Sequence, residues 1–207
     1  MAAPFHVLAG KVVLVILGFL LLLNACVQQT NHAEKTTVSL SETDSLQMMQ
    51  TASEATLALQ QTLSAALKKA MEDSGAAYAI HYCNLHVHPL TDSISEALRL
   101  NIARVSHRAR NPKNQASADE LRMIAAYEQQ LAEEKPLKPI LQKAGNQYTF
   151  YSPILIFSPL CLQCHGQPDT EIHPATLQAI QNLYPEDKAT GFRLQDVRGL
   201  WRVEFRQ

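Results

Sequence analysis

Apolar residues recur at helical spacing in the part of the chain that follows an apolar run over residues 12–23. From residue 44 to about residue 74 they fall three or four positions apart, which is typical of an amphipathic helix. Asp44 can cap the start of this helix, and Gly75 can stop it. The pattern therefore predicts a long helix over residues 44–74. Its apolar positions are Leu46, Met49, Leu59, Leu63, Ala66, Leu67 and Ala70.

The rest of the chain mixes helical and extended patterns. Ser117 followed by Glu120 matches the capping box that begins many helices, and residues 148–157 are rich in aromatic and β-branched side chains, as strands are. Early helices followed by antiparallel strands predict an α+β fold. The other expected elements are helices over 91–100, 117–134 and 174–183 and strands over 102–107 and 200–205.

The N-terminus is typical of an export signal. Lys11 precedes an apolar run over residues 12–23, which matches the central region of a signal peptide and is too short to span a bilayer. The run ends in Leu23-Asn24-Ala25-Cys26, which is close to the lipobox of bacterial lipoproteins. Ordinary secretory cleavage and an uncleaved anchor are the alternatives.

We therefore expect a protein on the periplasmic side of a bacterial membrane, held there by a lipid on Cys26. Val27 stands where an aspartate would be associated with inner-membrane retention, which favours the outer membrane. The expected divisions are a lipoprotein signal peptide over 1–25, a flexible tether over 26–43 and a folded domain over 44–207.

Composition narrows the range of partners. The chain has 18 Lys and Arg residues and 19 Asp and Glu residues, a formal net charge of -1, and it has no basic run. Nucleic acid is therefore not an expected partner. A chain of 207 residues is long enough to form one domain of ordinary size with its own core.

The strongest chemical signal is the pentapeptide Cys161-Leu162-Gln163-Cys164-His165. C-x-x-C-H is the attachment signature of c-type haem, in which two thiols bond to the porphyrin and the imidazole ligates the iron. A zinc knuckle would need a second pair of thiols, and a redox pair would sit in a thioredoxin-like unit; the sequence predicts neither. We expect one covalent haem c with His165 as its proximal ligand.

Further motifs accompany the pentapeptide in a fixed order. They are Ala79-Ile80-x-x-Cys83, Arg104-Val105-Ser106, Arg110-Asn111-Pro112-x-Asn114, Cys164-His165-Gly166, Tyr184-Pro185-x-Asp187-x-Ala189-Thr190-Gly191-Phe192 and Val197-Arg198-Gly199. From about residue 45 onward the chain thereby resembles the family of haem-c-binding, PAS-like sensor domains, which occur alone in periplasmic proteins or ahead of kinases and cyclases. It departs at Gln195, where that family usually has Gly.

The resemblance implies a PAS-like antiparallel sheet with a long N-terminal helix and flanking helices. It also implies that Cys83 lies opposite His165 as the second iron ligand. Cys83 is the one thiol without another expected role, and thiolate suits ferric iron. A buried structural cysteine, an open iron site or another ligand remains possible on the residues alone. The competing ligands are His81, His86, His88, Met48, Met49, Met71 and Met123.

Two other clusters could bear on this chemistry. Cys83 and the histidines around it, His81, His86 and His88, could together bind zinc or copper. Neither an extended nor a helical segment brings these four side chains to one face, so we expect a solvated histidine patch. Haem propionates need paired donors, and the guanidinium group is their usual partner. The candidates are Arg104, Arg110, Arg193 and Arg198.

Two functional classes follow from these expectations. The first is a redox or small-ligand sensor that signals through an unknown protein partner. The second is a periplasmic electron carrier in which the haem ligands do not change. No catalytic motif accompanies the pentapeptide, so we do not expect an enzyme.

Overall fold

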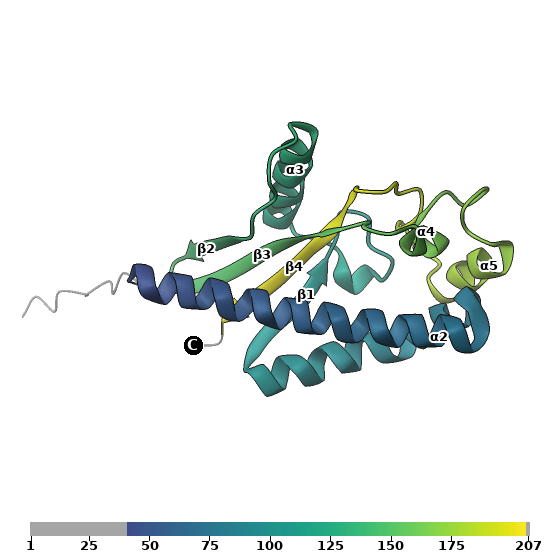
Figure 1. Cartoon of the computed structure of the whole chain (residues 1–207), viewed down its shortest axis with the longest axis horizontal. Helices are drawn as coiled ribbons and strands as arrows, with labels where there is room; N and C mark the ends of the chain where they lie inside the picture. The colour runs from purple at the N-terminus through teal and green to yellow at the C-terminus, as the bar shows by residue number, and fades with distance from the viewer. Residues whose placement is uncertain (1–40, 206–207) are drawn as a thin grey trace, which may run out of the picture. The chain divides into compact units, whose positions relative to one another are not determined.

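The computed structural model describes residues 41–205, which form an α+β unit (Figure 1). The expected fold class is thereby confirmed. The elements are α2 (Glu42–Leu98), β1 (Leu100–Val105), the 3-10 helix η1 (Pro112–Asn114), α3 (Ala118–Ala132), β2 (Ile140–Ala144), β3 (Gln147–Leu155), α4 (Pro159–His165), α5 (Pro174–Leu183) and β4 (Val197–Phe205).

The expected signal peptide, its lipidation residue Cys26 and most of the expected tether lie outside the described residues. Within residues 41–205, no helix combines the length and the apolar character that crossing a membrane requires.

The element α2 consists of two helices joined at a sharp break. Ser74 and Gly75 leave the helical conformation there, and Gly75 has φ +80°, which favours glycine. The chain reverses at this break, so the second half of α2 returns alongside the first (Figure 1). The predicted stop at Gly75 is confirmed, but the helix resumes at once and runs to Leu98. The second helix is therefore much longer than the one expected over 91–100.

The start of α2 differs from the prediction in its cap. Asp44 was the expected cap residue, but the N-cap is Ser41. The Ser41 hydroxyl accepts a hydrogen bond from the Asp44 amide at 3.1 Å, and the Asp44 carboxylate accepts one from the Ser41 amide at 3.3 Å. This reciprocal pair needs the hydroxyl three positions before the acid, so Asp44 acts inside the first turn.

The four strands form one antiparallel sheet in the order β1-β4-β3-β2. The first half of α2 packs along one face of this sheet (Figure 1), and Ile124 and Tyr127 of α3 pack against the other face. Alternate residues of β4 therefore enter different cores: Trp201 and Val203 pack beneath α2, and Leu200 packs beneath α3. The strands predicted over 102–107, 148–157 and 200–205 are confirmed as β1, β3 and β4, with shifted ends.

The prediction missed β2. This strand is short, lies at the edge of the sheet and exposes three of its five residues, so it has no apolar alternation to reveal it. It is recognisable only through its pairing with β3 across a tight turn that contains Gly145 at φ +61°.

The predicted capping box of α3 is confirmed, and it also ties α3 to the sheet. The Glu120 carboxylate accepts from the Ser117 amide at 2.7 Å and from Arg202 Nη1 of β4 at 3.1 Å. Glu120 is only 3% exposed, so both hydrogen bonds form away from water. One buried carboxylate therefore satisfies a helix end and a guanidinium together.

We expect Glu120→Ala to lower the free energy of unfolding by about 2 kcal/mol, because it removes the cap and leaves Arg202 with a weakened set of partners. Chemical denaturation of both proteins measures this loss. Glu133→Ala, at an exposed position just beyond the same helix, is the matched control and should change stability by less than about 0.5 kcal/mol. Equal effects of the two changes would contradict the role assigned to Glu120.

The turn before β4 keeps a backbone conformation that suits glycine. Gln195 has φ +71°, its amide donates to the Ile156 carbonyl at 2.7 Å, and the Asp196 carboxylate accepts from the Arg193 amide at 2.7 Å. The departure from the family pattern at Gln195 therefore leaves the turn in place and introduces strain.

Replacing Gln195 with Gly should stabilise the protein by up to about 1 kcal/mol, because relief of left-handed strain exceeds the entropy that glycine adds to the unfolded chain. Thermal unfolding of Gln195→Gly and of Gln195→Ala, which retains the strain, tests this. A gain in the alanine variant as large as in the glycine variant would show that strain is not the cause.

Candidate functional site

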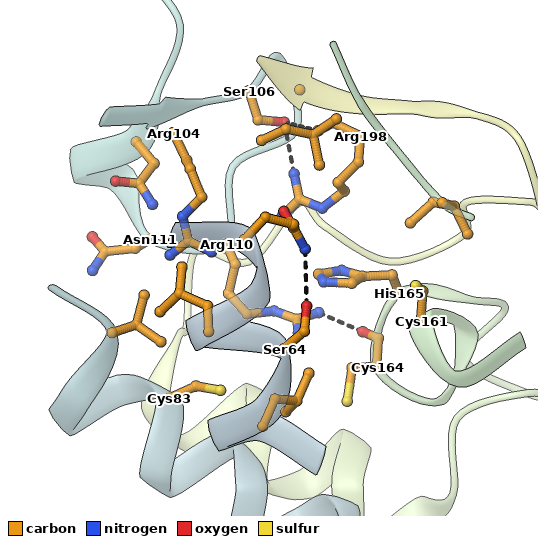
Figure 2. A pocket seen from close by; sticks show the side chains of 18 of the residues that line it. Ser64, Cys83, Arg104, Ser106, Arg110, Asn111, Cys161, Cys164, His165 and Arg198 are labelled. Carbon is orange, nitrogen blue, oxygen red and sulfur yellow. Dashed lines mark hydrogen bonds between the residues drawn. The ribbon is translucent and has the colours of Figure 1, made fainter. Parts of the chain in front are cut away.

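A cavity of about 410 Å³ is lined by both halves of α2, the ends of β1 and β3, and α4 (Figure 2). Much of its wall is apolar, with Leu63, Leu67 and Met71 from the first half of α2 and Ile80 and Val87 from the second. Of the expected cofactor-binding side chains, all but Arg193 line this one cavity. They are Cys83, Arg104, Arg110, Cys161, Cys164, His165 and Arg198.

The short helix α4 presents the pentapeptide to the cavity. Its N-cap is Ser158, whose hydroxyl accepts from the Leu160 amide at 3.1 Å, and Pro159 takes the first helical position, where no amide is needed. Positions three and four apart share one face of a helix. Cys161, Cys164 and His165 therefore reach the cavity together.

The two thiols of this group are free and partly buried. Burial raises the pKa of the Cys164 thiol to about 11, although the charge of Arg110 opposes this shift. Cys164 also packs against the apolar cluster between α2 and α5, which contains Ile80 and Ile180.

The His165 ring is held in one tautomer. Its Nδ1–H donates to the Ala189 carbonyl at 2.7 Å, which leaves the lone pair on Nε2. Burial, followed by the charges of Arg198 and Arg110, holds the pKa of His165 well below its ordinary value of 6.5, so the ring is neutral. In Figure 2 the ring points into the pocket. This is the state in which imidazole binds a metal ion.

The loop that carries Ala189 also packs against the ring. Phe192 is fully buried and meets His165 edge-on, with 6.3 Å between ring centroids and 90° between planes. The Phe192 amide donates to the His165 carbonyl at 2.8 Å, and the Gly191 amide donates to the Gly166 carbonyl at 2.7 Å. Backbone and side-chain contacts together fix the end of α4.

Cys83 projects from the second half of α2, on a different side of the pocket from His165 (Figure 2). Ile80, Cys83 and Val87 share the helix face that lines the cavity. Burial raises the pKa of the Cys83 thiol, and the charges of Arg104 and Arg110 partly offset this increase.

The competing ligands are separated by the same helix. His81 and His86 are exposed, and neither lines the cavity, whereas His88 does and lies 3.3 Å from the Asn111 amide nitrogen. Of the four methionines considered, only Met71 lines the cavity; Met49 of α2 and Met123 of α3 pack into the cores on the two faces of the sheet. Within the described chain, no group of three His, Cys, Asp or Glu side chains could hold a separate metal ion.

The cavity wall carries a surplus of positive charge. No Asp or Glu stands among the described residues that line it, whereas Lys68, Arg104, Arg110 and Arg198 do. Lys68 is 70% exposed, so the three arginines supply the buried charge. Of these three arginines, only Arg110 has an ion-pair partner within the described chain, Asp187 at 3.1 Å. Arg193, the fourth arginine considered, is exposed and does not line the cavity.

Arg198 and Arg104 are incompletely partnered. Arg198 Nη1 donates to the Ser106 hydroxyl at 2.8 Å, but its Nε is buried without a hydrogen-bond partner, and burial lowers the pKa of Arg198 to about 9. Arg104 lies 5.7 Å from the centre of the Trp201 ring, and burial lowers its pKa as well. Guanidinium groups in this state suit an anionic ligand.

These side chains fit an iron porphyrin with two carboxylates. The thiols of Cys161 and Cys164 and the neutral imidazole of His165 lie on one side of the cavity, and the Cys83 thiol lies on another. The guanidinium groups of Arg104 and Arg198 can bind the two carboxylates. The wall between them is apolar, as a porphyrin face requires.

Sequence reasoning missed several residues of this site. Ala189 contributes a backbone carbonyl, which no side-chain pattern reveals. Gln60 and Ser64 also line the cavity, and the Ser64 hydroxyl accepts from Gln60 Nε2 at 3.0 Å. The sequence pattern could have revealed Gln60 and Ser64, because these two polar residues, four positions apart, interrupt the apolar face of the predicted helix.

Fold and site thus define a class: an α+β domain in which a C-x-x-C-H helix and a distant cysteine line one cavity. The chain belongs to the Tll0287-like family, whose model matches residues 29–206. Among solved structures it is similar to the cyanobacterial heme-protein Tll0287, with 26% sequence identity, a TM-score of 0.49 and coverage of 58% of this chain and 70% of that one. No curated protein matches it.

His107 lies behind this site, edge-on to Phe192 at 6.1 Å between ring centroids. Its Nδ1 is buried without a hydrogen-bond partner, and its Nε2 lies 3.7 Å from Glu128 of α3. Burial lowers the pKa of His107 below 6.5; Arg108 and Arg198 act in the same direction, and Glu128 opposes them.

A lowered pKa means that the unfolded chain takes up a proton before the folded chain does. The contribution of His107 to stability is therefore complete above about pH 6.5 and is lost as the pH falls below that value. We expect the melting temperature to fall between pH 7.5 and pH 5.5, and to fall less in His107→Gln. An equally steep decline in this variant would assign the effect to other groups.

Proposed function

We propose that this chain is an exported protein with a single covalent haem c, and that it acts in redox or small-ligand sensing. The observation that carries the proposal is the state of His165. Its Nδ1–H is committed to the Ala189 carbonyl, so Nε2 is free to bind iron beside the two thiols of the same helix. Membership of the Tll0287-like family supports the same class of cofactor for this chain, since Tll0287 is a heme-protein.

In this proposal, Cys161 and Cys164 form the thioether bonds, and the haem supplies a one-electron couple. The propionates would be held by Arg104 and Arg198, whose guanidinium groups have no acidic partner among residues 41–205. Burying two carboxylates beside two unpaired guanidinium groups offsets the cost of desolvating both. The third arginine, Arg110, already has protein acceptors for its guanidinium group, so a propionate is not required there.

Cys83 is the second iron ligand in this proposal. It is the thiol that lines the cavity from α2, and although burial raises its pKa, the charges of Arg104 and Arg110 oppose this increase. Ferrous iron holds thiolate less strongly than ferric iron does, so reduction would weaken the bond to α2. Because α2 also covers the sheet, release of Cys83 offers a route by which a redox change or a small ligand alters the surface.

An electron carrier is the second candidate. Phe157 is 68% exposed and Leu160 is 40% exposed, and both line the cavity beside Cys161. An apolar rim of this kind would allow a redox protein to approach the porphyrin edge. In this case the iron ligands stay in place in both oxidation states.

The remaining parts of the proposal concern placement. We propose a PAS-like domain that a lipid on Cys26 anchors at the periplasmic side of a bacterial membrane, with the outer membrane favoured. An unidentified redox or signalling protein would be its partner. The argument for export is the N-terminal sequence, together with the requirement that c-type haem is attached outside the cytoplasm.

The absorption spectra of the full chain, produced with haem-attachment machinery, test these ideas. We expect covalent haem, a thiolate-type ferric spectrum and a change of ligation on reduction. Cys83→Ser should abolish the thiolate features while the haem stays attached, whereas His86→Ala, at an exposed position on the same helix, should change nothing. Spectra of the bis-His or His/Met type in both oxidation states, unaltered by Cys83→Ser, would favour the carrier. Absence of covalent haem would overturn the proposal.

A further inference from the structure

Arg110 joins three parts of the site that are distant in the sequence. Its Nη2 donates to the Cys164 carbonyl at 2.6 Å, and its Nε donates to Asp187 Oδ1 at 3.1 Å. The same Nη2 lies 3.3 Å from the Ala189 carbonyl. Arg110 and Asp187 are 12% and 9% exposed, so these contacts are shielded from water.

The Ala189 carbonyl is therefore shared by two donors. His165 Nδ1–H approaches it at 2.7 Å, and the guanidinium group of Arg110 approaches it at 3.3 Å. A carbonyl oxygen that accepts from a cation has less electron density to offer a second donor. Arg110 thus limits how far Ala189 draws the proton of His165, and with it how much imidazolate character the ring acquires.

Asp187 controls the strength of this effect. Its carboxylate neutralises the Arg110 charge, and its Oδ1 also accepts from the Ala189 amide at 3.0 Å, which positions the shared carbonyl. His165 also lies close to the Arg110 charge, since its ring and the guanidinium group approach the same Ala189 carbonyl.

We propose that Arg110 and Asp187 form a charge pair that sets the electron-donating strength of His165 through the Ala189 carbonyl. The inference rests on the proposed function, because it requires iron on His165 Nε2. Arg110 is thus a positioning residue that favours the reduced state. Asp187 opposes it and favours the oxidised state.

Both effects of Arg110 have the same sign. Its charge disfavours the extra positive charge of ferric iron, and its hydrogen bond weakens electron donation by His165. Loss of the guanidinium group should therefore lower the reduction potential, and loss of the Asp187 charge should raise it. Both changes should weaken the contacts around α4 and therefore lower the free energy of unfolding. Because they shift the reduction potential in opposite directions, an effect on the potential can be distinguished from a loss of stability.

The test compares three variants of the full haem-loaded chain by spectroelectrochemical titration and thermal unfolding. Arg110→Met should lower the potential by an amount corresponding to about a tenfold change in the oxidised-to-reduced ratio, which is about 59 mV for one electron. Asp187→Asn, which can keep the Ala189 amide contact, should raise it. Arg110→Lys keeps the charge and should restore most of the potential lost in Arg110→Met, although its melting temperature stays low.

Shifts of Arg110→Met and Asp187→Asn in the same direction, or unchanged potentials with lowered melting temperatures, would overturn the inference and leave the haem assignment intact. If Arg110→Met does not fold, the potential of Asp187→Asn is the deciding measurement. An unchanged or lowered potential in that variant overturns the inference. Wild-type protein without covalent haem would overturn the proposed function itself, so the two failures are distinguishable.

Discussion

The hydrogen bond from His165 Nδ1 to the Ala189 carbonyl is the constraint on which the site depends. A histidine at the end of a short helix would otherwise rotate, and its proton could lie on either nitrogen. The bond at 2.7 Å fixes both the tautomer and the ring plane. Phe192 packs against the His165 ring, and Arg110 donates to the carbonyl of Cys164, the preceding residue. These contacts hold His165 and Ala189 together.

The break in α2 has a comparable role at the scale of the fold. A straight helix from Glu42 to Leu98 would cover the sheet and continue beyond it, far from α4. Because the chain reverses at Gly75, the second half of α2 returns to the cavity and carries Cys83 to its wall. The break at Ser74 and Gly75, where Gly75 adopts a positive φ, thus allows one element to serve both the core and the site.

The distribution of charge explains why the cavity is suited to a dianion. Of the three buried arginines that line the cavity, only Arg110 pairs with a carboxylate of the described chain, and the pKa values of Arg104 and Arg198 are lowered by burial. Such an arrangement is unfavourable without a ligand, because guanidinium groups lose hydration and repel each other. Two carboxylates supplied by a cofactor would relieve that cost.

The sequence by itself determined the local elements and the local chemistry. The C-x-x-C-H motif, the Ser117–Glu120 cap and the break at Gly75 all depend on residues within a few positions of each other, so pattern alone revealed them, whereas the short helix that carries the motif was not predicted. The α+β class followed from the order of these elements.

Only the tertiary structure decided which distant residues meet. Cys83 and His88 reach the cavity while His81 and His86 do not, because the segment is helical and only one face is buried. Arg110 was expected as a propionate partner, and only the fold shows that its guanidinium group also donates to Asp187 and two backbone carbonyls. Backbone acceptors such as Ala189 have no sequence signature, since every residue has a carbonyl and only folding selects the one that faces His165.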